Sequence, residues 1–246
     1  MIVREVQARS ILSRSKIHDY TVNPYTGCQH GCIYCYARFM KKYSGHPEPW
    51  GQFVDVKVNA PDLLRKEITK KPRGGVWVSG VCDPYQPLER RYRLTRACLE
   101  ILIEAGWPVT VQTRSALVTR DIDLFERAEN IEVGLSVTTA DDGVRKLFEP
   151  DAPAIPARLD ALQTLHDAGV RTFAMIAPLL PGAGALADAL AGRVDRVLAD
   201  RINYRYADHI YKQHGLEHAA TEEFYRRTVT QLAERFREAG IPFQAV

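Results

Sequence analysis

The sequence has no hydrophobic run long enough to cross a membrane, because charged or polar residues interrupt every apolar stretch before the roughly 18 residues that a spanning helix needs. The N-terminal segment MIVREVQARSILSRSK lacks the apolar core and cleavage site of a secretory signal. Glycine and proline are scarce, at 16 and 14 of 246 residues, which excludes collagen-like and low-complexity classes. We therefore expect a globular, cytoplasmic protein.

An excess of charge of one sign is also missing. Lys and Arg number 33 against 30 Asp and Glu, and the net charge of +3 is too small to establish nucleic-acid binding, although it permits a local basic patch. The length suffices for a substantial buried core. We expect a single domain over residues 1–246, with its core at about 18–200 and a C-terminal loop or lid and closing helix over 201–246.

Cysteines are few but grouped. Of the five, Cys28, Cys32 and Cys35 fall within eight residues, a pattern that does not suit a disulfide framework in a reducing compartment. Three converging thiolates suit iron and sulfur, and because a [4Fe-4S] cluster normally takes four cysteines, three leave one iron open. A structural zinc completed by His30 or Cys82 is the alternative, although zinc sites usually show two paired couples of ligands.

Short β-branched runs alternate with longer amphipathic runs, which predicts repeated βα units. We expect an α/β fold, namely a partial, open (β/α)6 barrel of the TIM type with parallel strands, because about six units fall short of the eight of a full barrel. Residues 202–218 have no clear period and are predicted to form a functional loop or lid. The predicted strands are 20–23, 54–58, 75–80, 108–113, 131–138, 172–177 and 193–202, and the predicted helices include 60–70, 94–105, 119–127, 159–166 and 221–239.

The segment NPYTGCQHGCIYCYAR resembles the signature of the radical S-adenosylmethionine (SAM) superfamily, with Tyr34 at its aromatic position. Together with SGVCDPYQPLE, SVTT and IAPLLPG it is similar to the spore photoproduct lyase-like branch, over roughly residues 18–185. The resemblance implies that Cys28, Cys32 and Cys35 hold a [4Fe-4S] cluster and that the open iron chelates SAM. It also implies reductive cleavage of SAM to a 5′-deoxyadenosyl radical, which abstracts a hydrogen atom from the substrate.

Ligands of parallel sheets bind beyond the carboxyl ends of the strands. By resemblance we expect the cofactor there, near Tyr34. The other cofactor-binding candidates are Ser79, Gly80, Arg114, Ser136 and Ala177. The alternatives are a local turn or capping role for Ser79 and Ser136 and a surface ion pair for Arg114.

The substrate-binding site is predicted to lie just after Gly80, where an acid, an amide and a phenol follow one another and would form a polar recognition surface. The alternative is a proline-rich turn in which Asp83 caps its own backbone. By resemblance Cys82 is a candidate catalytic hydrogen donor, although it is displaced by about two positions from the family's cysteine, and the alternative is a buried structural thiol. Cys98 lies at helical spacing from Leu94, Ile101 and Leu102, which predicts that its side chain is buried in the core. The predicted substrate-binding residues are Asp83, Tyr85, Gln86 and Glu89.

The implied partners are SAM, an electron donor such as a flavodoxin or ferredoxin, and a substrate that the sequence does not fix. A basic and aromatic mixture in the C-terminal part suits nucleic acid, or else forms an ordinary helix face. Its members are Arg201, Arg205, Lys212, Arg226, Arg227, Tyr204, Tyr206, Tyr211 and Tyr225. Repair of DNA by lyase chemistry is one hypothesis, and the same radical chemistry on a peptide or RNA is another. An iron-sulfur sensor or electron carrier that does not turn over is the alternative from a different class.

Overall fold

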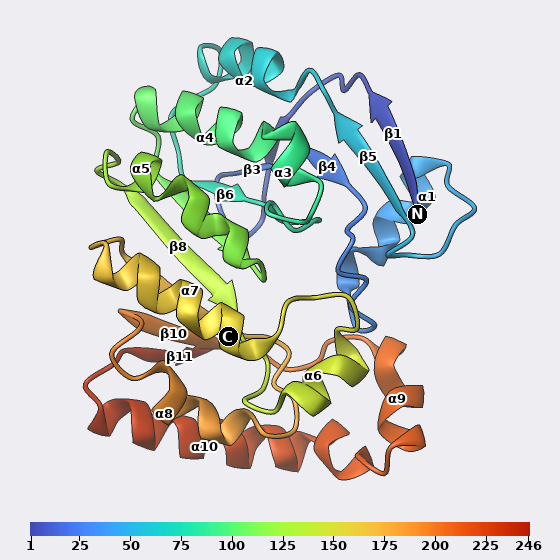
Figure 1. Ribbon diagram of the computed structural model, residues 1–246, viewed down its shortest axis with the longest axis vertical. Coiled ribbons are helices and arrows are strands. Elements are labelled where there is room, and N and C mark those ends of the chain that lie inside the picture. The colour runs from blue at the N-terminus through green and yellow to red at the C-terminus, as the bar shows by residue number, and fades with distance from the viewer.

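The computed structural model describes residues 1–246 and contains a large, mostly parallel sheet covered by helices (Figure 1). Its strand order is β11-β10-β9-β8-β7-β6-β3-β2, and only the β2–β3 pair is antiparallel. The expected α/β class with parallel strands is therefore confirmed. The strands are β2 (Leu12–Arg14), β3 (Tyr20–Val22), β6 (Val76–Val78), β7 (Val109–Thr113), β8 (Ile131–Ser136), β9 (Thr172–Ile176), β10 (Arg196–Ala199) and β11 (Phe243–Ala245).

Helices connect the parallel strands, and several end where the sequence predicts. Gly106 and Gly169 take positive φ angles of 67° and 74° just after α4 and α7. Thr221 caps α10 by accepting a 3.2 Å hydrogen bond from the Phe224 amide. The helices are α1 (Lys41–Ser44), α2 (Ala60–Ile68), α3 (Glu89–Tyr92), α4 (Leu94–Glu104), α5 (Ile122–Phe125), α6 (Asp142–Phe148), α7 (Ile155–Asp167), α8 (Leu186–Leu190), α9 (Asp208–Gln213) and α10 (Glu222–Glu238), with 3-10 turns at Tyr36–Met40, Ala116–Asp121, Ala183–Ala185, Arg205–Ala207 and Glu217–Ala220.

The main core lies between this sheet and its helices and comprises 40 buried residues. Cys98 of α4 is fully buried in it beside Leu99 and Leu102, as its spacing predicts. Burial holds the pKa of the Cys98 thiol above its usual range. This cysteine is therefore a structural residue of the core.

A second, three-stranded sheet corrects one prediction. It has the order β1 (Ile2–Val6), β5 (Phe53–Lys57), β4 (Tyr25–Thr26). The strand predicted at 54–58 exists as β5, but it pairs with β1 and β4 rather than joining the parallel series. In Figure 1 β1 and β5 lie at the upper right, and Val54 and Val56 of β5 pack in one hydrophobic cluster with Leu94 of α4.

Two further predictions need correction. The helix predicted at 119–127 is a 3-10 turn followed by the four-residue α5, because the Ser115 side chain accepts the Leu117 amide and starts the turn earlier. The predicted loop at 202–218 contains α9 and two 3-10 turns. It packs through Tyr211 against Phe148 of α6, with ring centroids 4.8 Å apart, and Figure 1 shows α9 beside α6.

No helix is both long and apolar enough to span a bilayer.

Candidate functional site

The cysteine loop follows β4 and turns sharply against β5. Gly27 starts the turn with a φ of 90°, and a Cβ atom there would lie 2.3 Å from the Phe53 carbonyl oxygen. Only glycine fits this close backbone approach. The loop is joined to α6 by a 2.9 Å hydrogen bond from the Ile33 amide to the Phe148 carbonyl.

The loop brings the three predicted ligand thiols together. Cys28 and Cys32 are buried, Cys35 is partly exposed, and none forms a disulfide. Burial raises the pKa of Cys32 to about 12, with the charge of Cys35 adding to the effect and that of Arg114 opposing it. No three His, Cys, Asp or Glu side chains, the three cysteines included, converge at the distances of a single metal ion.

The surroundings of the thiols fit an iron-sulfur cluster. Two buried N–H donors near Cys35 have no hydrogen-bond partner of normal geometry within the chain: Arg38 Nε and Trp50 Nε1. Burial raises the pKa of Cys35, and both Arg38 and the Trp50 indole act to lower it, so these two groups lie beside that thiol. Thiolate ligands together with unused N–H donors near them are what cluster sulfur requires.

Arg114 and Tyr34, both predicted cofactor contacts, lie together. Arg114 Nη2 donates to the Tyr34 hydroxyl at 3.0 Å, and Arg114 Nε lies 3.4 Å from Glu149 Oε1. The Tyr34 hydroxyl also donates to Glu149. Arg114 uses two of the five N–H donors of a guanidinium in these contacts, and its side chain remains 20% exposed, so donors stay free for an anionic ligand.

The end of β6 is organised by Asn23, which follows β3. Its Oδ1 accepts the amides of Gly80 and Val81, each at 2.9 Å, and the Ser79 hydroxyl at 2.6 Å. The Gly80 carbonyl accepts the Tyr36 hydroxyl. The predicted contacts Ser79 and Gly80 therefore lie at the carboxyl ends of β3 and β6, next to the cysteine loop.

The remaining predicted cofactor residues lie at the ends of β8 and β9. Ser136 is fully buried and its hydroxyl accepts Gln112 Nε2 at 3.1 Å. Ala177 directly follows β9 and is partly exposed. Because β7 pairs in parallel with β8 and β8 with β9, both residues lie at the same sheet edge as Arg114.

Cys82 is held apart from the three grouped thiols. It packs with the hydrophobic cluster around Tyr25, whereas Cys32 and Cys35 pack in another cluster with Phe148. Its sulfur lies 2.9 Å from the Ser79 hydroxyl oxygen, and since that hydroxyl donates to Asn23, the thiol is the donor in this contact. Burial raises the pKa of Cys82 to about 11, so the group is a neutral thiol with a hydrogen to give.

The predicted substrate-binding residues point into the protein. Asp83 accepts hydrogen bonds from the Tyr85 and Arg114 amides at 2.9 and 2.8 Å and from the Thr113 hydroxyl at 2.5 Å. Its Oδ2 also lies 3.3 Å from His30 Nε2. Burial would raise the pKa of Asp83, but His30, Thr113 and the Arg114 amide together hold it at about 2.

The other three predicted substrate contacts are fully buried as well. Tyr85 donates to Asp121 at 2.9 Å, and Gln86 accepts the Gln29 amide at 3.0 Å. Glu89 accepts the Tyr25 hydroxyl and the Thr95 amide. These contacts support the structural alternative, and a substrate role for these residues stays a prediction that would require them to exchange their present partners.

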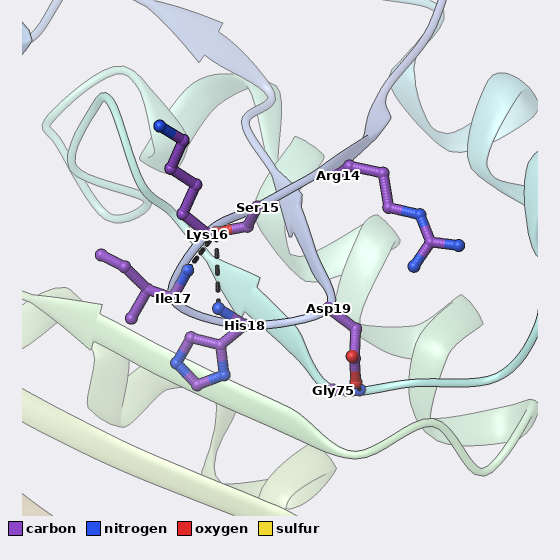
Figure 2. Close-up of a pocket in the computed structure, with 7 residues that line it drawn as sticks. All are labelled: Arg14, Ser15, Lys16, Ile17, His18, Asp19 and Gly75. Carbon is purple, nitrogen blue, oxygen red and sulfur yellow. Dashed lines mark hydrogen bonds between the residues drawn. The ribbon is translucent and has the colours of Figure 1, made fainter.

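A hollow lies at the opposite end of the sheet, on the turn between β2 and β3 (Figure 2). It is lined by Lys16, His18 and Asp19 among others, and the Ser15 hydroxyl accepts the Ile17 and His18 amides there. Asp19 is already bonded to the Gly75 amide at 2.8 Å. The hollow holds no cysteine and is remote from the strand ends that carry the site.

Sequence reasoning missed Asn23 and Glu149. Asn23 is the last residue of the strand predicted at 20–23, and this position at the sheet edge was a usable signal. Glu149 gives no such signal, because it lies 115 residues from its partner Tyr34. Only the fold brings this carboxylate to the cysteine loop.

The comparisons agree with this geometry. The sequence model of the Radical SAM superfamily matches residues 22–184. An uncharacterized protein of Methanocaldococcus jannaschii is 38% identical over 179 residues, which are 72% of this chain and 67% of that protein. An uncharacterized protein of Mycobacterium tuberculosis is 34% identical over 186 residues, and the match covers 71% of this chain and 54% of that protein.

Two solved structures share the fold. Spore photoproduct lyase complexed with dinucleoside spore photoproduct aligns with a TM-score of 0.73 over 99% of this chain and 81% of that chain, at 16% identity. Streptococcus suis SuiB bound to the precursor peptide SuiA aligns with a TM-score of 0.59 over 92% of this chain and 48% of that chain, also at 16% identity. At such identities the likeness concerns the fold.

Proposed function

The chain belongs to the radical SAM superfamily, and from this we propose that it binds a [4Fe-4S] cluster through Cys28, Cys32 and Cys35 and uses SAM to abstract a hydrogen atom from a substrate. The observation that carries the proposal is the set of three free thiols beside unused buried N–H donors. When bound, the cluster supplies the electron that cleaves SAM to methionine and a 5′-deoxyadenosyl radical. An external reductant such as a flavodoxin or ferredoxin would deliver that electron.

We propose that the strand ends hold SAM. Arg114 keeps free N–H donors at a partly exposed position, which suits a charge-assisted bond to the methionyl carboxylate. Gly80 is partly exposed at the end of β6, and Ser79 precedes it. Tyr34, Ser136 and Ala177 complete the proposed set at the same sheet edge. The likeness to spore photoproduct lyase supports a further proposal, that this sheet curves into the expected partial barrel.

Cys82 is a candidate donor that would return a hydrogen atom to a product radical. Its thiol is neutral at physiological pH and partly exposed, and its hydrogen points to Ser79 beside the proposed SAM site. Tyr36, which directly follows Cys35, joins the cysteine loop to the segment that carries Cys82, because its hydroxyl donates to the Gly80 carbonyl. A hydrogen-return role for Cys82 is compatible with this placement.

A surface next to the cysteine loop supports nucleic acid as the substrate. We name it the aromatic rim: the exposed residues Tyr36, Tyr204 and Tyr206. Tyr204 and Tyr206 stack with an interplanar angle of 2° and centroids 5.4 Å apart. Exposed aromatic rings bind bases by stacking, and neighbouring cations bind the phosphates.

Cations accompany the rim. The Arg38 guanidinium lies 5.3 Å from the centre of the Tyr206 ring, and the Arg205 side chain, which is 94% exposed, pairs with Asp208 at 2.7 Å. Exposed rings accompanied by cations support a single-stranded nucleic acid as the substrate. Lyase chemistry on a DNA lesion stays a narrower hypothesis.

The test of radical chemistry is anaerobic reconstitution with iron and sulfide, followed by dithionite and SAM, with 5′-deoxyadenosine as the readout. We expect product from the wild type and from Cys98→Ala, whose thiol lies in the core, and none from Cys32→Ala. Product from Cys32→Ala would overturn the ligand assignment. A full cluster that neither binds nor cleaves SAM would instead support the sensor or electron carrier.

A further inference from the structure

Behind the cysteine loop lies a fully buried carboxylate that no part of the signature contains. Glu149 follows α6 and receives donors from four separate segments. Its Oε1 accepts from the Tyr34 hydroxyl, from Thr138 Oγ1 at 3.0 Å and from Arg114 Nε at 3.4 Å. Its Oε2 accepts from Arg158 Nη2.

Arg158 is the buried counter-cation. Its side chain is 0% exposed and donates to the carbonyls of Pro153 and Ser136, both at 2.9 Å, besides its bond to Glu149. Since each of its nitrogens is engaged, the guanidinium is fixed in place. A buried ion pair of this kind is costly to break, because removing one partner leaves an uncompensated charge.

The network lies beside two of the proposed cluster ligands. Tyr34 stands between Cys32 and Cys35 in the chain; its hydroxyl donates to Glu149 and accepts from Arg114, whose guanidinium lies 5.8 Å from the centre of the Tyr34 ring. Two guanidiniums and one carboxylate therefore place a net positive charge beside the segment that carries these two thiols. In a buried site such charges are weakly screened.

We propose that Glu149 is a positioning residue that holds Arg114 and Tyr34 at the cysteine loop and that, with Arg158, sets the reduction potential of the cluster. This rests on the proposed function, since it requires the cluster. Net charge and hydrogen bonding around a cluster are the protein's means of tuning its potential. A reduced cluster carries one more negative charge, so added positive charge nearby favours the reduced form.

The test is an EPR-monitored redox titration of reconstituted protein. Glu149→Gln keeps the shape of the side chain and removes its charge, so the potential should shift to a more positive value. Arg158→Met removes a positive charge and should shift it to a more negative value. The double variant restores the net charge and should return close to the wild type. The matched control is Glu132→Gln, whose carboxylate pairs with Arg196 at the other end of β8.

Shifts of opposite sign in the two single variants, with none in the control, are the expected result. Equal potentials in all four variants, or shifts of the same sign, would overturn the proposal. Loss of the cluster from all three network variants but not from Glu132→Gln would show a purely structural role and also overturn it. A wild type that takes up no iron would refute the proposed function instead, so the two failures are distinguishable.

Discussion

At the scale of single residues, the depressed pKa of Asp83 predicts a specific loss of stability in acid. The pKa falls from an ordinary value of 3.8 to about 2, because the contacts to His30, Thr113 and the Arg114 amide outweigh the effect of burial. A carboxyl with a lowered pKa contributes stability above pH 4, and this is lost as the pH falls toward 2. Asp83→Asn should therefore lower the free energy of unfolding of the apoprotein by about 2–3 kcal/mol at pH 7.

The measurement is urea unfolding of wild type and variant at pH 7 and pH 2.5, where the difference between them should shrink. Asp123→Asn is the matched control, since that carboxyl also has a pKa of about 2 but its side chain is 57% exposed. Solvent screening makes its effect much smaller. An equal loss in the two variants, or an Asp83→Asn difference that persists at pH 2.5, would contradict the linkage.

Single residues also show what a sequence can reveal about a site. Cys28, Cys32 and Cys35 are neighbours in the chain, so their spacing alone predicts that they meet. The orientation of side chains is different: Gln86 and Glu89 follow a strand end as predicted, yet both are fully buried. Nothing local distinguishes an inward carboxylate such as Glu89 from an outward one, because its partner Tyr25 lies 64 residues away.

At the scale of elements, the loop between β4 and the Tyr36–Met40 turn depends on Gly27. An alanine there would place its Cβ 2.3 Å from the Phe53 carbonyl oxygen and separate β4 from β5. We expect Gly27→Ala to lower the free energy of unfolding by about 3 kcal/mol or more, since backbone atoms must move. Iron uptake on reconstitution should fall as well, because the loop carries the thiols.

Gly45 supplies the matched control. It has a φ of 67° after α1, but a Cβ added there meets nothing within 4 Å. Gly45→Ala should cost only about 1 kcal/mol from the left-handed backbone and leave iron uptake unchanged. Chemical unfolding and iron analysis of both variants make the comparison, and equal destabilisation would mean that the contact with β5 is not what requires glycine at Gly27.

Elements with local signals were predictable, and those made by distant pairing were not. Helix α7 stops before Gly169 as its sequence indicates, because the cap is encoded in the chain next to it. Strand β1 lacks such a signal, since Ile2 pairs with Phe53, far along the chain. Because of this long-range pairing, the strand predicted at 54–58 belongs to the small sheet with β1 and β4 and not to the large parallel sheet. Strand existence is thus readable where periodicity is clear, whereas sheet membership depends on tertiary contacts.

At the scale of the whole molecule, a net charge of only +3 means that any affinity for nucleic acid must come from a local surface. The aromatic rim is the surface proposed for this role, and its stacked pair Tyr204 and Tyr206 lies just before α9. Base stacking on an aromatic side chain is worth about 1–3 kcal/mol per base. Replacing both tyrosines by alanine should therefore weaken binding of a labelled single-stranded oligonucleotide of about a dozen residues at least tenfold.

Fluorescence anisotropy at several salt concentrations measures both parts of this binding. The logarithm of the affinity of the wild type should fall linearly with the logarithm of the salt concentration, because counterions are released from the phosphates. Arg237→Ala is the control, since this exposed cation lies in the last turn of α10, at the end of the helix far from the rim. If the double tyrosine variant binds like the wild type, or if salt has no effect, nucleic acid is not the partner of the rim, and a peptide substrate becomes the better hypothesis.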